Sequence, residues 1–344
     1  YSLDRRRFES DNELMPRTSS HAGREMAAAK VSVILTAYNA ADFVEEAVRS
    51  IQAQTWPNIE LIAIDDGSRD QTGALLDRLA CEWTADGRIM VVIHQSNVGA
   101  AGARNVGLSR ASGEFLAIFD ADDVFDASLV ERQVLLLQQH ADLDLAFALY
   151  RYVNEDGQFV SRQQPPAQDR LGSRDLLADN IVHAPLFRAN ILQDVGGFDP
   201  DLRAHIDLDF FLRVTGRRAN SVGVIAEPLS SYRRHSAQIT GDWRRMRANH
   251  ARVLAKSQAA GLELAAADRR RIAGRTRLYW ATLAYQAGDY DAARHLALRS
   301  LLSAPSQMLR DPHGRVRLAA CLASTLPAPL HDGLRRWFNA RQPV

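Results

Sequence analysis

The stretch "VSVILTAYNAADFVEEAVRSIQAQTWPNIELIAIDDGS", residues 31–68, decides the fold of this chain. Residues 31–39 form a β-branched and nearly continuous apolar run, which is typical of a strand buried on both faces of a sheet. Apolar residues recur at helical spacing in 41–56, and a second apolar run occupies 59–64. A strand, a helix and a second strand in this order predict a parallel β-α-β unit.

The alternation continues to the end of a fourth predicted strand. Its later members are a helix at 67–83, a strand at 89–95, a helix at 99–112 and a strand at 114–120. Ser68 or Asp70 is the expected N-cap of the first of these helices. Strands and helices in alternation predict an α/β fold, in which a mostly parallel sheet is flanked by helices.

Polar side chains stand at the end of every predicted strand. They are Thr36, Tyr38 and Asn39, then Asp65 and Asp66, then His94 to Asn97, and finally Asp120 to Asp123. Open parallel sheets bind their ligands at the carboxyl ends of the strands. The sequence therefore predicts a site at this edge of the sheet.

The fourth strand ends in "IFDADDVFD", residues 118–126, which holds four acids. Carboxylates this close repel one another, and some would take up protons unless a cation neutralises them. The stretch alone leaves two interpretations open, a solvated acidic loop and a metal site.

The pattern is looser in the second half of the chain. It predicts a helix at 128–139, a strand at 143–153, a polar hairpin near 154–157 and a Pro-containing linker at 161–169. From Trp243 onward Ala, Leu and Arg predominate and predict helices, and 279–306 resembles one helix-turn-helix of a tetratricopeptide-type repeat. One copy is not an array. We therefore expect a helical appendage packed on the main domain or on a partner.

Composition excludes several functional classes. A formal net charge of +1 gives no overall field that points to nucleic acid or membrane. The two lysines, Lys30 and Lys256, lie outside the main domain, which excludes a mechanism that needs a lysine there. Cys81 and Cys321 form neither a disulfide framework nor a zinc spacing, and this favours a reducing cytosol.

The ends of the chain carry no membrane signal. No apolar run reaches the about 18 residues that a membrane-spanning helix needs. Residues 1–29 are rich in charge, Ser and Arg, and predict a disordered tail rather than a signal peptide. The sequence begins with Tyr1, and Met26 is an alternative beginning.

Two nucleotide-binding classes lack their motifs. A dinucleotide-binding dehydrogenase needs G-x-G-x-x-G directly after a strand, whereas the first strand is followed by "TAYNAADF". The glycine cluster "NVGAAGARNVG" at 97–107 has a different spacing and follows the third strand. A phosphorylatable receiver domain is expected to use a lysine late in the sheet, and none is present. A sugar-nucleotide transferase is the remaining class.

Four ordered blocks resemble a family 2 glycosyltransferase with the Rossmann-like GT-A fold. They are 31–72, the block "NVGAAGARNVGLSRASGEFLAIFDADD", the block "VGGFDPDLRAHIDLDFFLR" and "YRRHSAQIT", and together they span about 31–240. The resemblance implies a donor-binding half at 30–124 and an acceptor-binding, catalytic half at 125–240. Residues 241–344 are then a helical C-terminal region.

The resemblance implies that the donor is a nucleoside-diphosphate sugar, UDP-linked. Its nucleoside would be held by Thr36, Ala37, Tyr38, Asn39, Asp65 and Asp66, and Asn97, Gly99 and Arg104 would lie near the donor. Tyr38 would stack on the base, and Asp66 would accept a hydrogen bond from it. The alternatives are a strand-end core aromatic for Tyr38, a helix cap for one aspartate and a surface salt bridge for Arg104.

The acidic stretch matches the D-x-D motif of the family. By this resemblance Asp120 faces the ribose, and Asp122 binds a Mg²⁺ or Mn²⁺ ion that also contacts the diphosphate. Asp123 supports the site, and Asp126 caps the next helix. The metal would make this concentration of charge tolerable, and without it we expect a mobile loop.

The block "YRRHSAQIT" is expected to close the site. His235 resembles the histidine that completes the metal or diphosphate shell in some relatives. Arg233 and Arg234 would meet phosphate oxygens, which suit a guanidinium group. The remaining candidate histidines, His94, His183 and His205, are expected to be structural.

The segment "HIDLDFFLR" matches the acidic motif E-D-x-D-x-x-x-R of the family. Asp207 falls on the general base, Asp209 on a second, acceptor-side acid, and Arg213 fits an ion pair with it. Ile206 replaces the usual Glu, which predicts an unusual acceptor specificity or an unusual pKa of the base. Asp207 would take a proton from the acceptor hydroxyl, and one direct displacement would invert the anomeric configuration.

The resemblance thus implies a metal-dependent inverting glycosyltransferase of bacterial surface polysaccharide or glycan assembly. The acceptor is a glycan or a lipid-linked sugar, nucleic acid is not a partner, and the protein is cytoplasmic or bound at the inner membrane face. The arginine-rich stretch 242–253 would touch headgroups there, or form a solvated helix face, and the helical C-terminus would offer a protein contact. A sugar-phosphate nucleotidyltransferase and a non-catalytic nucleotide-binding relative are the alternatives.

Overall fold

The structure, a computed structural model, describes residues 28–83, 88–179, 182–235, 242–305, 318–319 and 321. In chain order the elements of the first half are β1 (Val31–Ala37), α2 (Val44–Gln52), β2 (Ile59–Asp65), α3 (Thr72–Trp83), β3 (Ile89–His94), α4 (Ala100–Arg110), β4 (Phe115–Asp120), β5 (Val124–Phe125) and α5 (Leu129–Gln139). Then come β6 (Leu145–Val153), β7 (Phe159–Arg162), β8 (Arg170–Leu171), α6 (Ser173–Ala178), β9 (Leu186–Arg188), η2 (Ala189–Ile191), α7 (Leu192–Val195), α8 (Ile206–Arg217), β10 (Val222–Arg233), α9 (Trp243–Ala259), α10 (Ala266–Gln286) and α11 (Tyr290–Ser303).

The first four strands form the predicted parallel half of the sheet. Their spatial order is β3-β2-β1-β4, and every neighbouring pair is parallel. In this register Thr36 lies opposite Asp120 and Ala37 lies opposite Asp65. The polar ends of β1, β2 and β4 therefore meet at one edge of the sheet, as the sequence predicts.

The second half of the sheet is mixed. Strand β9 lies antiparallel between β4 and β6, whereas β6 and β10 are parallel to each other. Strand β5, directly after the acidic stretch, pairs antiparallel with the end of β10. This pairing brings residues 120–126 next to residues 230–235, although more than a hundred positions separate the two segments in sequence.

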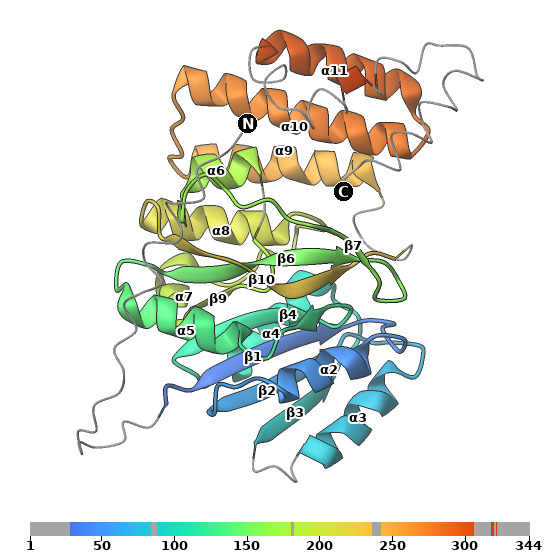
Figure 1. The fold of residues 1–344 in the computed structure, drawn as a ribbon, viewed down its shortest axis with the longest axis vertical. Coiled ribbons are helices and arrows are strands. Elements are labelled where there is room, and N and C mark those ends of the chain that lie inside the picture. The colour runs from blue at the N-terminus through green and yellow to red at the C-terminus, as the bar shows by residue number, and fades with distance from the viewer. Residues whose placement is uncertain are drawn as a thin grey trace.

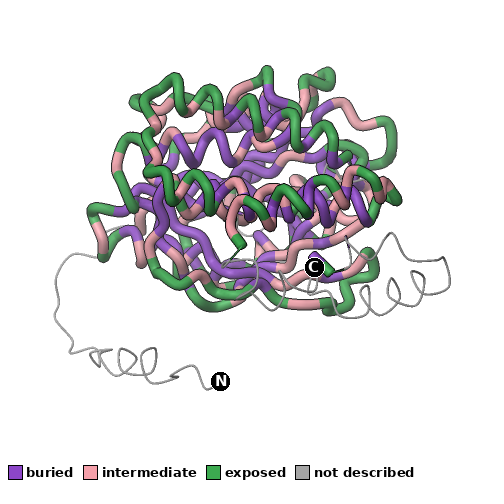
Figure 2. The backbone as a smooth tube through the Cα atoms, turned by 90° about the horizontal axis from the view of Figure 1, so that it is seen from above, coloured by how far each residue is buried: buried purple, intermediate pink, exposed green. Residues whose placement is uncertain are grey.

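Helices cover both faces of the sheet (Figure 1). Val33 and Leu35 of β1 pack in the core that includes residues of α2, α3 and α5, whereas Ile34 points into the core formed with α4 and α8. Alternate side chains of one strand thus serve two cores, which explains the continuous apolar run. Figure 2 shows the buried backbone in the interior, between more exposed helices.

The C-terminal helices α9, α10 and α11 stack above α6 and α8 (Figure 1). Val253 of α9 and Ile272 of α10 belong to the same core as α8, so these helices continue the main domain. The turn between α10 and α11 uses Gly288 with φ 77°, and Asp289 caps α11 by accepting from Ala292 N. The predicted helical region and its "GDY" turn are confirmed over 242–305.

Local boundaries follow side-chain chemistry. Helix α3 begins at Thr72, whose N–H donates to Asp70 Oδ1 at 3.0 Å, so Asp70 is the better of the two predicted caps. Ser68 instead accepts a hydrogen bond from Asn39 N at 2.9 Å. The predicted disordered tail falls almost wholly on residues 1–27, which lie outside the described part of the chain. No helix in the described ranges has the length and apolar character to cross a membrane.

Candidate active site

The four acids at the end of β4 and just after it each have a partner in the protein. Asp120 pairs with Arg104, Asp122 with His235, Asp123 with His183 and Asp126 with Arg151. Cationic or hydrogen-bonding side chains from four other segments therefore compensate part of this charge, beside any contribution of the expected metal. Asp126 does not cap α5 either: the N-cap position is Ser128, without a side-chain hydrogen bond.

Arg104 connects the acidic stretch with the candidate base. Its side chain extends from α4, and the residue is 5% exposed. Nη2 donates to both oxygens of Asp120, at 2.8 and 3.1 Å, and Nη1 donates to Oδ1 of Asp207. The ring of Phe198 lies 5.4 Å from the guanidinium and fixes its plane. One side chain thus holds together residues from β4 and α8, and Arg104 is a buried ion-pairing group rather than a surface arginine.

The surroundings shift the pKa values of Asp207 and Asp120 in opposite directions. Burial raises the pKa of Asp207, and Arg104 only partly opposes this effect. Burial would also raise the pKa of Asp120, but Arg104, together with His183 and Thr36, holds that pKa below its ordinary value. The Asp207 side chain remains 39% exposed, so a substrate hydroxyl can reach it. A reachable carboxylate with a raised pKa suits a proton acceptor.

His235 meets the second acid of the motif. Its Nε2 lies 3.1 Å from Oδ2 of Asp122, and its ring packs against Phe43 at a centroid distance of 4.9 Å. Arg233 also fixes the turn that carries Asp122, because its Nε donates to the carbonyl oxygen of Asp122 at 3.0 Å. The predicted metal residues Asp122 and His235 are therefore adjacent.

This pair is an incomplete metal site by itself. Among the described residues, no three or more His, Cys, Asp or Glu side chains are grouped to hold an ion. Mg²⁺ and Mn²⁺ suit such a site, since Mg²⁺ usually keeps several waters and binds one or two carboxylates together with substrate phosphates. The Asp122 carboxylate and the His235 imidazole could supply two protein ligands to such an ion, and the diphosphate of the donor would supply others.

Asp123 belongs to a buried chain of polar groups that motif analysis did not find. His183 Nε2 lies 2.7 Å from Asp123 Oδ2, and His183 Nδ1 lies 2.9 Å from Ser230 Oγ. Burial raises the pKa of Asp123 to about 6, although His183 opposes the shift. Asp123 also accepts from Arg233 N at 2.8 Å. These bonds support the turn, as expected for Asp123, but His183 is in a stretch without any recognisable pattern.

An aromatic cluster adjoins the acids on the β6–β10 side. Its members are Tyr150, Tyr152, Tyr232 and His183, with ring centroids 4.9 to 5.8 Å apart in the contacting pairs. Burial and the charges of the acids near Tyr232 raise the pKa of its phenol. Arg234 lies over the ring of Tyr152, at 4.5 Å from the centroid. These rings form a wall beside the acidic stretch.

Hydrogen bonds join the loop after β2 to the loop after β3. Asp66 accepts from Val98 N and Gly99 N, each at 2.9 Å, so it fixes the start of α4. Asp65 accepts from Ser68 N at 3.0 Å and lies 3.0 Å from His94 Nδ1. Both predicted donor aspartates thus organise the loops at the strand ends, and His94 has the expected structural role.

The other predicted donor residues lie on the same edge. Tyr38 is 49% exposed, which excludes the alternative of a core aromatic. Asn39 has φ 49° and accepts from Arg69 N at 2.8 Å. Thr36 and Ala37 end the buried strand β1, and Asn97 and Gly99 lead into α4. The structure therefore groups the predicted nucleoside residues around the ends of β1, β2 and β3.

Asp209 and Arg213 do not reach this site. Asp209 is 1% exposed, and its carboxylate accepts from Arg213 Nε at 3.0 Å and pairs with Lys256 at 2.8 Å. The predicted ion pair is present, but the Asp209 carboxylate is buried on the side of α8 that faces α9. The interpretation of Asp209 as an acceptor-side acid is not supported by this position. Lys256 also enters the main domain from α9, contrary to the expectation for the lysines.

Arg233 and Arg234 are likewise committed to protein contacts. Only 4% of the Arg233 side chain is exposed, and it pairs with Glu46 as well as with the Asp122 turn. Arg234 covers the Tyr152 ring. These contacts support the turn and the aromatic wall, and a role of either arginine at the phosphates stays a prediction.

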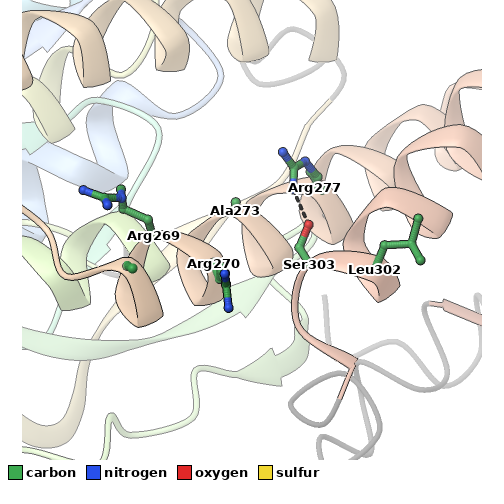
Figure 3. Close-up of a pocket in the computed structure, with 7 residues that line it drawn as sticks. Arg269, Arg270, Ala273, Arg277, Leu302 and Ser303 are labelled. Atoms are coloured by element: carbon green, nitrogen blue, oxygen red, sulfur yellow. Dashed lines mark hydrogen bonds between the residues drawn. The ribbon is translucent and has the colours of Figure 1, made fainter.

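A hollow of about 410 Å³ lies elsewhere, between α10 and α11. Arg269, Arg270 and Arg277 line it, but their side chains point in different directions, and Arg277 donates to Ser303 (Figure 3). The three guanidinium groups thus present no common point to an anion. The strand-end edge, with its converging side chains, remains the candidate active site.

Comparisons with known proteins agree on one family. The family described as "Glycosyl transferase family 2" matches residues 32–196. Glycosyltransferase GlyG of Streptococcus pneumoniae is 35% identical over 130 residues, which are 38% of this chain and 42% of that protein. The UDP-Glc:alpha-D-GlcNAc-diphosphoundecaprenol beta-1,3-glucosyltransferase WfgD of Escherichia coli is 34% identical over 39% of this chain and 52% of its own length. The alignments thus span about half the length of these relatives.

A solved structure shares the fold across nearly the whole chain. The mannosyltransferase PcManGT of Pyrobaculum calidifontis, in complex with GDP-Man and Mn²⁺, has a TM-score of 0.54 at 20% identity. The match covers 92% of this chain and 84% of that one. This similarity extends beyond the residues matched by the family and includes the helical C-terminal region, which confirms the predicted GT-A-like architecture.

Proposed function

The chain belongs to glycosyltransferase family 2, and we propose that it moves a sugar from a nucleoside-diphosphate sugar to a hydroxyl group with inversion of the anomeric carbon. One observation carries the proposal: Arg104 binds Asp120 and Asp207 at once. A donor acid and a reachable proton acceptor are therefore held side by side at the strand ends, where ligands of open sheets bind.

Asp207 is the proposed general base. It accepts the proton of the acceptor hydroxyl while the hydroxyl oxygen attacks the anomeric carbon from the side opposite the diphosphate. The bond from that carbon to the diphosphate oxygen breaks, and the nucleoside diphosphate leaves with the electron pair. One displacement turns an α-linked donor into a β-linked product. Arg104 donates to Asp207 and opposes the rise of its pKa, which favours the ionised form that a base needs.

Asp122 and His235 are the proposed protein ligands of Mg²⁺ or Mn²⁺. The distance of 3.1 Å between their polar atoms and their place beside the donor acid Asp120 support this assignment. When bound, the ion supplies positive charge that offsets the charge developing on the departing diphosphate. The mannosyltransferase with the same fold was solved with Mn²⁺, which supports a metal in this chain as well.

The donor side is built from the ends of β1, β2 and β3. Tyr38 is exposed there and offers a ring face for the base. Asp65 and Asp66 hold the loops that carry Ser68, Val98 and Gly99. The Escherichia coli relative is named for a UDP-linked donor, and we propose UDP for this chain too.

The acceptor is proposed to be a glycan, free or linked to a lipid, in the assembly of a bacterial surface polysaccharide. The Escherichia coli relative, which is named for a diphosphoundecaprenol acceptor, supports this class. Residues 242–305 carry twelve Arg or Lys side chains against five acids, whereas the whole chain has a net charge of +1. Such a basic region favours contact with the anionic inner face of the cell membrane, and we place the protein in the cytoplasm at that face.

A ligand panel tests the proposal. UDP-glucose, UDP-N-acetylglucosamine, UDP-galactose and GDP-mannose are added to the full chain with Mn²⁺, and thermal stability and release of nucleoside diphosphate are measured. At least one UDP-sugar should raise the melting temperature and be hydrolysed slowly. Pyrophosphate release from a nucleoside triphosphate and a sugar phosphate, with no response to any nucleotide sugar, would instead identify a nucleotidyltransferase.

A further inference from the structure

The N-terminus of α8, which carries Asp207, is held by α9 and α10. Ala204, three positions before Asp207, packs in the core formed by Trp243, Leu278 and Trp280 of these two helices. Arg203 N donates to Oδ1 of Asn249 on α9 at 3.2 Å. The segment that precedes the candidate base is thus anchored in the helical region rather than in the sheet.

His205 is the residue at which this anchoring is tightest. It occupies the N-cap position of α8 with φ 56°, a left-handed conformation that few non-glycine residues adopt. Its ring meets those of His250 on α9 and Trp280 on α10 edge-on, at centroid distances of 5.3 and 5.7 Å. Its Nε2 is buried without a hydrogen-bond partner in the described structure. A backbone in this state persists only where its surroundings determine it.

A second contact acts one turn further along α8. Lys256 of α9 lies 2.8 Å from Oδ1 of Asp209 and 2.7 Å from Oδ2 of Asp199. Asp209 is buried, and Arg213 holds its other oxygen. The ammonium group therefore joins the two ends of the segment 199–209, and Asp207 is inside that segment.

From these contacts we infer that α9 and α10 position the proposed base, Asp207. Trp280 acts through its contact with His205, and Lys256 acts through its ion pair with Asp209. Together they set the position of the Asp207 carboxylate relative to Arg104 and the acceptor. Trp280 and Lys256 are positioning residues, since neither touches the reacting atoms. The inference rests on the proposed function of Asp207. A small displacement of a reacting group lowers the rate of reaction much more than it lowers substrate binding.

The test compares two variants with a matched control in the donor-hydrolysis assay, with the most rapidly hydrolysed nucleotide sugar of the panel. Trp280→Leu should lower kcat about tenfold and leave the donor KM within about twofold, because the donor side is built from other elements. Trp280→Phe, which keeps a ring, should recover most of the loss. Leu296→Ala creates a cavity in the same helical core from α11 and leaves the His205 and Lys256 contacts in place, so it should lower thermal stability without changing kcat.

Lys256→Met gives a second measure, because the Lys256 side chain is 43% exposed and its replacement leaves the core intact. It should lower kcat in the same way, and Lys256→Arg should restore it. Equal kcat values for Trp280→Leu, Lys256→Met and Leu296→Ala would overturn the inference. If Asp207→Asn itself hydrolyses the donor like the wild type, the base assignment fails and the inference fails with it. If Asp207→Asn is inactive while Trp280→Leu and Lys256→Met keep the wild-type kcat, the positioning role is refuted and the assignment of the base is retained.

Discussion

The guanidinium of Arg104 donates a hydrogen bond to the carboxylate of Asp207, although 103 positions separate the two residues in sequence. The same guanidinium binds Asp120 at the end of β4. One side chain therefore joins the proposed donor acid to the proposed base. We expect a change at the Asp120 carboxylate to affect Asp207, because both carboxylates share a single cation.

Replacement of Arg104 should affect stability and activity together. Arg104→Met leaves two carboxylates without their cation, and we expect the free energy of unfolding to fall by about 2 kcal/mol, less than for a fully buried pair because both acids are partly solvated. Turnover should be lost. Arg104→Lys is the matched control: it keeps the charge but cannot span both acids, so it should regain stability and little activity. Urea unfolding and nucleotide release measure both effects, and wild-type values for Arg104→Met would contradict the bridge.

Metal binding should depend on Asp122 more than on His235. In calorimetry, UDP should bind the wild type more tightly with Mn²⁺ than without it, since the ion brings the diphosphate and the carboxylate together. Asp122→Ala should abolish this difference, and His235→Ala should reduce it. Asp126→Ala is the control, because that acid pairs with Arg151 and is not assigned to the ion. The metal assignment is wrong if UDP affinity is the same with and without Mn²⁺ in every protein.

The half-buried histidines His205 and His250 predict a specific loss of stability in acid. Burial, aided by neighbouring His250, lowers the pKa of His205 to about 3, and burial lowers that of His250 to about 4. Their ordinary pKa is about 6.5, so the unfolded chain binds more protons as the pH falls below that value. Each histidine therefore removes about 1.4 kcal/mol of stability per pH unit until its folded pKa is reached.

A variant isolates this effect from other titrating groups. His250→Phe keeps a ring beside His205 and Trp280 but cannot take up a proton. Its free energy of unfolding relative to the wild type should rise as the pH falls from about 7 to about 4.5, and it should be constant above about pH 7.5. Chemical unfolding at several pH values measures the difference. A difference that does not change with pH would show that His250 is solvated and titrates normally.

Local sequence patterns predict the features that depend on neighbouring residues. The β-branched run at 31–37, the acids after β4 and the "GDY" turn before α11 are each visible in a short window. The strand order and the common edge follow from the handedness of β-α-β units. For this reason the amino-acid sequence alone is sufficient to place the polar strand-end residues at one edge of the sheet.

Pairings across long sequence distances are not predictable in this way. Asp126 precedes a helix and is expected to cap it, but Arg151 of β6, on the other side of β10, pairs with it instead. Asp209 shares a motif with Asp207 and yet faces the opposite side of α8, where Lys256 arrives from another helix. His183 has no motif at all, and only the fold brings it to Asp123.

The most direct test of the account is to measure Asp207→Asn in two assays at once. The variant removes the proton acceptor but keeps the shape and the hydrogen-bonding capacity of the side chain. We predict that UDP with Mn²⁺ binds it with nearly the wild-type affinity by calorimetry, while release of nucleoside diphosphate from the preferred UDP-sugar falls by roughly 10² to 10⁴. Turnover at the wild-type rate by Asp207→Asn would contradict the central claim that this carboxylate is the base.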